Sequence, residues 1–192
     1  MNKTDIIDLT RLKRGQIISR KYVEFFDRLS LYLGSPPTGF PHFAILASPV
    51  DNSSDWYTFN ATVRSVMTLV PLSCYKGQTV RVYSVKDGDV DFAWDQANSF
   101  VEKQVRYEGL SGWNYIFRIL PSLLLYWIKH GPKPVPWNKI PNVDSPDRIN
   151  CLVLIRRCYP NLIPNDCCAS ASAFEQAYRD GKLILEQEGI IV

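Results

Sequence analysis

The sequence predicts an α+β fold in which an antiparallel sheet of four to six strands carries its helices on one face. Short apolar runs rich in β-branched and aromatic residues follow one another between turn residues in the first half of the chain. Stretches in the second half repeat apolar residues at the helical spacing. A length of 192 residues with 46% hydrophobic content is enough for one core. We therefore expect residues 1–192 to form a single domain.

The strands of this sheet are expected early in the chain. Residues 5–12 form a short helix or an extended lead-in, and residues 21–33 have apolar positions near the helical period. A loop rich in Gly and Pro follows at residues 34–39. The runs that alternate with turn residues predict strands at residues 15–19, 42–47, 56–63, 65–71 and 79–84.

The helices are expected in the rest of the chain, at residues 92–107, 151–159 and 171–180. The first of them places Ala93, Ala97, Phe100, Val101 and Val105 on one face. Gly181 fits the position just after the last helix, where a left-handed residue ends many helices. Residues 183–192 form an edge strand or a tail.

Residues 109–147 are expected to form an irregular insertion rich in Pro and aromatic residues, and such long insertions are often functional. Its apolar stretch at 116–128 is interrupted by Arg118, Pro121 and Ser122, and is too short to span a membrane. A buried helix or a lid over a cleft is expected there, with contact to a lipid surface as the lesser alternative.

Charge and cysteine content exclude several classes of protein. The net charge is +3 and the basic residues are scattered, so we expect no nucleic-acid partner. Five cysteines, two of them adjacent, argue against a disulfide framework, and the N-terminal residues lack a signal-length apolar core. We expect a protein that is cytoplasmic as synthesised, with no transmembrane segment and no cofactor. Delivery in a virion, or by another route without a signal peptide, is the alternative.

His42 and Cys151 are the residues that point to chemistry. His42 enters an apolar strand in Pro41-His42-Phe43-Ala44, and Cys151 opens an apolar helix that Asp147 or Asn150 can cap. A thiol nucleophile needs a base to remove its proton, and a helix N-terminus favours the thiolate. The chain has two histidines. His130 lies in the irregular insertion, and an irregular segment holds a base less firmly at hydrogen-bond distance than a sheet does, so His42 is the better candidate.

Asn60 is the candidate for the third group of this site. It lies on the strand that follows His42, where neighbouring antiparallel strands put side chains on one face. Its amide oxygen can accept a hydrogen bond from the imidazole and so fix the tautomer.

Two alternatives remain for the cysteines. Cys167 and Cys168 also precede a helix and are competing nucleophiles. A metal site from these two cysteines, His42 and an acid is disfavoured, because adjacent cysteines lack the two-residue gap that lets both reach one zinc ion.

The order of these motifs resembles the circularly permuted branch of the NlpC-type papain-fold hydrolases, which contains YiiX-like proteins and the lecithin–retinol acyltransferase group. The segments that carry the resemblance are Gly15-Gln16-Ile17-Ile18, His42-Phe43-Ala44-Ile45, Phe59-Asn60-Ala61, Pro71-Leu72, Tyr107-Glu108-Gly109 and Asn150-Cys151. The sequence departs from the pattern at Gln16, where an acid is usual, at Asn60, where Glu or His is usual, and at Leu152.

The resemblance implies a permuted papain-like fold and a cysteine hydrolase acting on an amide bond, with peptidoglycan peptides as substrate and a phage origin as one setting. Cys151 would be the nucleophile, His42 the base and Asn60 the orienting residue. The alternatives are an inert structural or binding module with protein partners in a larger assembly, such as a virion, and a lipid acyl hydrolase or acyltransferase.

Overall fold

The computed structural model of the chain describes residues 5–21, 40, 42–51, 55–60, 66–107, 112–131, 142, 144, 148–167 and 169–192. At residues 107 and 112–119 it describes the backbone alone. The helix expected at residues 21–33, apart from Lys21, lies outside the described residues, as does Cys168.

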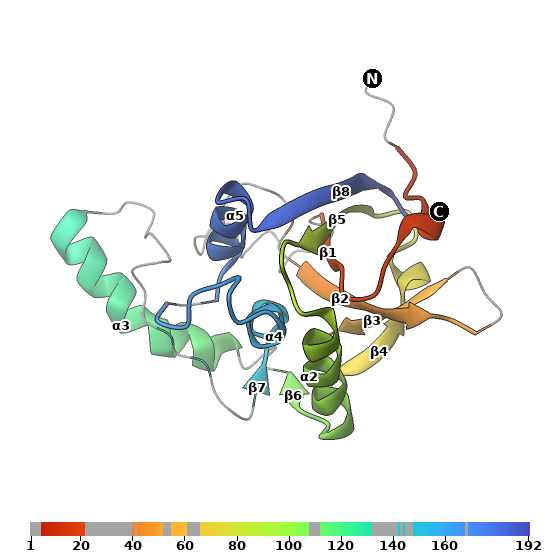
Figure 1. Cartoon of the computed structure of the whole chain (residues 1–192). Coiled ribbons are helices and arrows are strands. Elements are labelled where there is room, and N and C mark those ends of the chain that lie inside the picture. Colours follow the sequence, from red (N-terminus) through yellow and green to blue (C-terminus); the bar gives the residue numbers. More distant parts are fainter. Residues whose placement is uncertain are drawn as a thin grey trace.

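A six-stranded antiparallel sheet forms the centre of the molecule (Figure 1). Its order is β4-β3-β2-β1-β5-β8, so both ends of the described chain contribute strands. The bounds are β1 Ile17–Arg20, β2 His42–Pro49, β3 Trp56–Asn60, β4 Thr68–Pro71, β5 Thr79–Val85 and β8 Leu183–Ile190. The predicted antiparallel sheet is confirmed, and the last segment is an edge strand rather than a tail.

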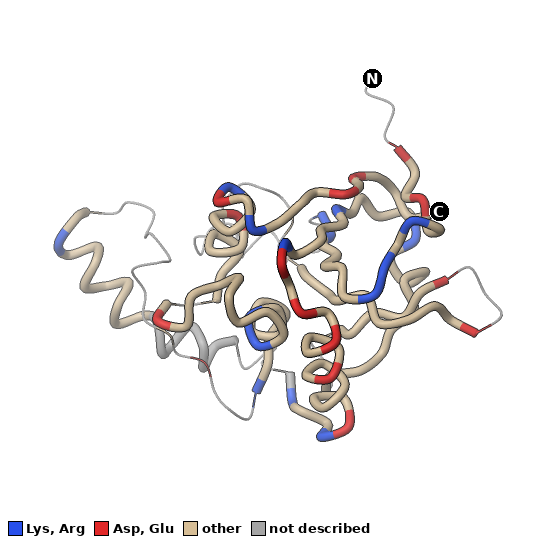
Figure 2. The backbone as a smooth tube through the Cα atoms, in the orientation of Figure 1, with Lys and Arg blue, Asp and Glu red and all other residues tan. Residues whose placement is uncertain are grey.

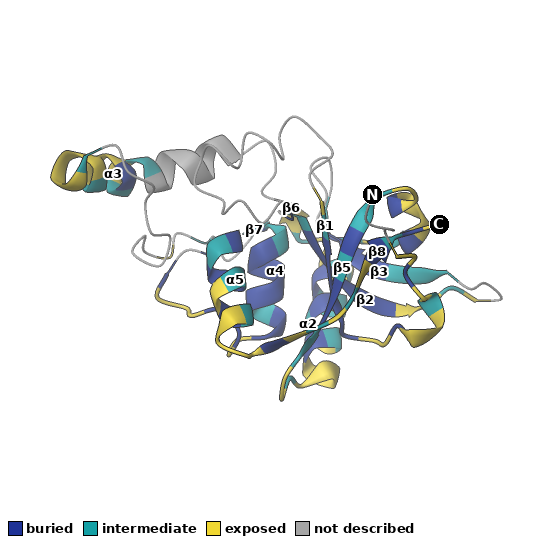
Figure 3. Cartoon of the chain, turned by 90° about the horizontal axis from the view of Figure 1, so that it is seen from above, coloured by how far each residue is buried: buried dark blue, intermediate teal, exposed yellow. Residues whose placement is uncertain are grey.

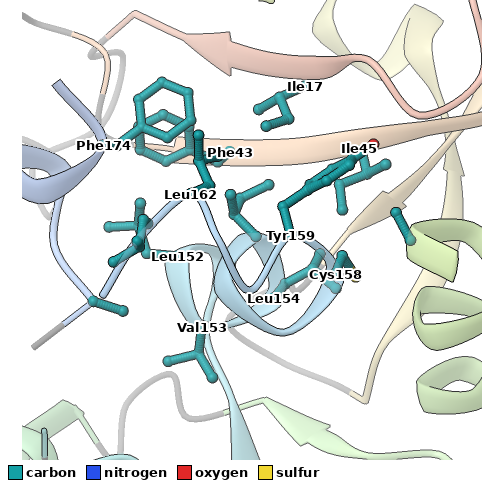
Figure 4. Close-up of a cluster of buried hydrophobic side chains, with 14 of the residues drawn as sticks. Ile17, Phe43, Ile45, Leu152, Val153, Leu154, Cys158, Tyr159, Leu162 and Phe174 are labelled. Atoms are coloured by element: carbon teal, nitrogen blue, oxygen red, sulfur yellow. The ribbon is translucent and has the colours of Figure 1, made fainter. Parts of the chain in front are cut away.

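Three helices pack on one face of this sheet, as predicted: α2 Val90–Glu102, α4 Cys151–Cys158 and α5 Ala171–Arg179. Strand alternation sends Phe43 and Ile45 toward them, into a core that includes Leu154 and Phe174 (Figure 4). The other face carries Leu46 and a smaller core. Two short 3₁₀ helices, η1 Leu9–Arg11 and η2 Leu72–Tyr75, contribute residues to this second core.

The end of α2 differs from the prediction. The helix stops at Glu102, because Gln104 takes a left-handed φ of 49°. The amide of Gln104 bonds to the carbonyl of Val101, and that of Val105 bonds to Phe100, which is the pattern of a Schellman cap. The same cap ends α5 at Gly181, as predicted from the glycine there. Glutamine is not typical of this left-handed position, so Gln104 did not indicate that α2 ends there.

After this cap the chain turns into a short strand, β6 Arg106–Tyr107. β6 pairs in parallel with β7 Arg148–Ile149, the two residues that precede the cap of α4. The expectation that residues 92–107 form one helix was therefore wrong at its C-terminal end.

The prediction of an irregular insertion at residues 109–147 was also wrong for much of its length, because α3 Gly112–His130 is a continuous helix. Pro121 lies inside it, although a proline in a helix interior removes a hydrogen bond and costs about 3 kcal/mol. α3 extends away from the sheet and the other helices (Figure 3). Most side chains of its last turns are exposed, so the expected buried helix was wrong as well. None of the helices among the described residues is both long and apolar enough to cross a membrane.

Candidate functional site

Cys151 is the first residue of α4, as its sequence predicts. Asn150 caps the helix, and its Oδ1 accepts hydrogen bonds from the amides of Leu152 (3.0 Å) and Val153 (2.9 Å). Of the two predicted caps, Asp147 lies outside the described residues. The cap fixes the first turn of α4, so the half-buried Cys151 side chain is held at a defined position beside the core.

A chain of backbone pairings ties this end of α4 to the strand that carries Asn60. Asn60 pairs with Thr68 on β4, and two residues earlier Val66 forms a bridge with Arg106 of β6. Arg106 pairs in turn with Arg148 of β7, three residues before Cys151. Neighbouring strands lie about 4.8 Å apart, so residues far apart in sequence are held at one end of the sheet.

His42 and Asn60 are joined directly. His42 Nε2 lies 3.1 Å from Asn60 Oδ1. The register of β2 with β3 places them diagonally on one face rather than directly opposite. An amide oxygen can only accept, so Nε2 carries the hydrogen and donates it. The other ring nitrogen, Nδ1, is therefore the one that can accept a proton.

Tyr75 completes this cluster, and the sequence analysis missed it. Asn60 Nδ2 donates to the Tyr75 hydroxyl, which also lies 3.4 Å from His42 Nε2. The two rings of His42 and Tyr75 meet edge to face, with centroids 6.3 Å apart. Tyr75 sits on η2, whose position depends on tertiary packing, so no local pattern in the sequence indicates it.

Cys151 influences one member of this cluster, Tyr75. Burial raises the pKa of Tyr75 above its usual value, Arg20 opposes that rise, and the Cys151 and Cys74 thiols add to it. Such an influence requires the two groups to be close. The structure therefore joins His42, Asn60 and Tyr75 directly, and it brings the Cys151 thiol near enough to Tyr75 to influence its pKa. Perturbed pKa values of this kind are typical of functional sites.

His42 is held neutral. Its pKa is lowered from 6.5 to about 3, chiefly by burial and then by the positive charge of Arg20, whereas the hydrogen bond to Asn60 opposes the shift. Arg20 is the direct partner of His42 in the pairing of β1 with β2. Since a neutral imidazole can accept a proton and an imidazolium cannot, His42 is in the protonation state of a base at neutral pH.

This shift gives a stability prediction. Below pH 6.5 the unfolded chain binds a proton at His42, whereas the folded protein does so only near pH 3. Acidification between these values therefore favours unfolding, and His42 should cost up to about 1.4 kcal/mol of unfolding free energy per pH unit. Urea unfolding of wild type and His42→Gln across this range measures the difference. The exposed His130 provides the control, His130→Gln. Parallel curves for wild type and His42→Gln would contradict the burial of a neutral imidazole.

The other predicted residues lie elsewhere or are buried. Gln16 directly precedes β1, four residues before Arg20, and its carbonyl accepts from the amide of Leu46. Its side chain bonds to Ser84 and to the amide of Lys13. It serves a buried turn there and does not reach His42. His130 ends α3 and stacks on Tyr126, with ring centroids 4.5 Å apart, so it lies on a helix and not on an irregular segment.

Cys167 differs from Cys151 in its surroundings. It is buried, its thiol donates to the carbonyl of Pro164 at 3.7 Å, and burial raises its pKa. No group of three His, Cys, Asp or Glu side chains among the described residues could hold a metal ion. A pocket of about 440 Å³ lies at the opposite end of α4, against Cys158 and Tyr159. A helix rises 1.5 Å per residue, so this pocket is roughly 10 Å from Cys151.

Comparisons with known proteins find a likeness in structure. No protein family and no curated protein matches the sequence. The fold is similar to the crystal structure of the metalloprotein YiiX from Escherichia coli O157:H7, with a TM-score of 0.49 and 15% sequence identity. The alignment covers 93% of this chain and 98% of that one.

Proposed function

We propose that this protein is a thiol-dependent hydrolase that cleaves an amide bond, with Cys151 as nucleophile and His42 as base. The observation that carries the proposal is the hydrogen bond from His42 Nε2 to Asn60 Oδ1, which directs the free Nδ1 away from Asn60. In this proposal Asn60 is a positioning residue, and Tyr75 supports Asn60 in turn.

The proposed reaction has two halves. His42 Nδ1 takes the thiol proton as the sulfur of Cys151 forms a bond to the substrate carbonyl carbon. The carbon–nitrogen bond then breaks, and the imidazolium returns the proton to the departing amine, which leaves a thioester. Water attacks this thioester while His42 accepts its proton, and the carboxylic acid departs as the proton returns to the sulfur. The backbone amide of Cys151 is the proposed donor to the oxyanion, because those of Leu152 and Val153 donate to Asn150.

The substrate proposed is a peptide of peptidoglycan. That choice rests on the resemblance of the His42, Asn60 and Cys151 segments to the permuted papain-fold hydrolases and not on a binding site. The mechanism above applies to any amide or ester whose carbonyl can reach the sulfur, so the chemistry and the substrate are tested separately.

Thiol labelling tests the chemistry without a known substrate. Iodoacetamide at neutral pH is expected to modify Cys151 ahead of Cys158 and Cys167, because burial raises the pKa of Cys158 to about 12 and raises that of Cys167. His42→Ala should slow labelling of Cys151 because the base is lost. Peptide mass spectrometry after timed quenching gives the rate at each cysteine.

Cys74 is the internal reference for this experiment, because it is exposed. The ratio of Cys151 to Cys74 labelling removes any difference in reagent or protein concentration. A ratio that is the same in wild type and His42→Ala would show that His42 does not act on the thiol, and would favour an inert module.

A further inference from the structure

The last turns of α3 present an apolar stripe that no other described element covers. Leu124, Leu125 and Ile128 are 47%, 69% and 82% exposed, and Pro121 lies on the same side of the helix. Leu123 is buried and lies on the opposite side by the helical spacing of 100° per residue. The last turns of α3 thus have a covered side at Leu123 and an uncovered side at Leu125 and Ile128, and Figure 3 shows these turns as mostly exposed. Contiguous exposed apolar surface of this kind marks a docking site.

The charge of the sequence segment that contains the stripe indicates its occupant. Residues 109–143 contain no Asp or Glu, whereas Arg118, Lys129, Lys133 and Lys139 are all basic. In the described part of α3, Lys129 is exposed beside Ile128, and no acidic residue accompanies it (Figure 2). Trp127 is 41% exposed, and tryptophan and lysine are both typical of helix ends at a membrane interface.

We infer that α3 binds a surface of anionic lipid, with Leu125 and Ile128 entering the boundary between headgroups and acyl chains. An amphipathic helix with apolar residues on one side and lysine next to them binds such surfaces by burial and by charge. A second copy of this chain fits less well, because a two-fold contact would place Lys129 at the contact twice, with no acidic partner in the described part of α3. This inference is independent of the proposed hydrolase.

Vesicle sedimentation tests the inference with lipid of defined composition. Wild type should bind vesicles of phosphatidylcholine and phosphatidylglycerol in equal parts, bind vesicles of phosphatidylcholine less, and lose affinity as salt is added. The double variant Leu125→Glu with Ile128→Glu should bind at least about tenfold more weakly, because it replaces the two exposed apolar side chains that would enter the lipid by negative charges. Ile184→Glu alters an exposed isoleucine on β8 and should bind as wild type does.

Two further measurements keep the result unambiguous. Circular dichroism should show that both variants fold, as expected for exposed positions. Cys151→Ser should bind vesicles as wild type does. Vesicle binding is therefore tested independently of whether the protein is a hydrolase. Equal binding by wild type and the double variant, or no binding by either, would overturn the inference. Light scattering that shows a wild-type dimer, separated by the double variant without any vesicle binding, would assign the stripe to a second copy instead.

Discussion

Replacing Cys151 by serine is expected to reduce the release of peptides from purified peptidoglycan by at least about 10⁴-fold. Serine has nearly the same size, so α4 and its Asn150 cap should be retained. A hydroxyl is a much weaker nucleophile than a thiolate, and loss of a nucleophile removes most of the rate enhancement of such enzymes. Mass spectrometry of the soluble products after digestion by wild type and Cys151→Ser provides the measurement.

Cys74→Ser is the matched control for this experiment, because it makes the same change at an exposed cysteine. It should retain wild-type activity. Asn60→Ala should lose less than Cys151→Ser, about 10²-fold, because it misplaces His42 and does not remove a reacting group. Full activity of Cys151→Ser would reject Cys151 as nucleophile and direct attention to Cys167 and Cys168.

A negative result from wild type has a different meaning. If wild type releases no peptide but His42→Ala still changes the labelling ratio of Cys151 to Cys74, the thiol chemistry stands and the substrate is another amide or an ester. If neither assay responds, the proposed function fails.

The relation of His42 to Asn60 could be predicted because it depends on local pattern. Strand alternation and the short connection between their strands put both on one face, and the helix that begins at Cys151 has a capping residue directly before it. The strands of the sheet and the cap at Gly181 could also be predicted, because each depends on a local sequence pattern.

Other features of the site depend on tertiary contacts that a single sequence does not reveal. Tyr75 reaches Asn60 because η2 folds over the second face of the sheet, and Arg20 acts on His42 because β1 lies beside β2 in a particular register. The pairing of β6 with β7 was missed because Gln104 ends α2 without the expected glycine. α3 was missed because Pro121 and the prolines after residue 130 suggested an irregular segment.

Arg156 should give the largest loss of stability, because its charge is buried and fully engaged. Its side chain is 3% exposed and pairs with the carboxylate of Asp144. It also donates to Asn142 Oδ1 (3.0 Å) and to the carbonyls of Pro164 (3.3 Å) and Cys167 (2.6 Å). One guanidinium thus joins the segment that precedes α4 in the sequence and the segment that follows it to the helix that carries Cys151.

Arg156→Met is expected to lower the free energy of unfolding by about 3 to 5 kcal/mol, because it leaves a buried carboxylate without its cation. Urea unfolding followed by circular dichroism measures the change. Arg157→Met is the control on the same helix, where the guanidinium lies 5.7 Å from the Phe100 ring, and should cost less than about 1 kcal/mol.

The double variant Arg156→Met with Asp144→Leu separates the ion pair from packing. Removing both charges should recover part of the lost stability, since replacing a buried pair by apolar residues is often nearly neutral. A double variant as unstable as the sum of the two single variants would show that the carbonyl bonds of Arg156, rather than its pairing with Asp144, hold these segments against α4.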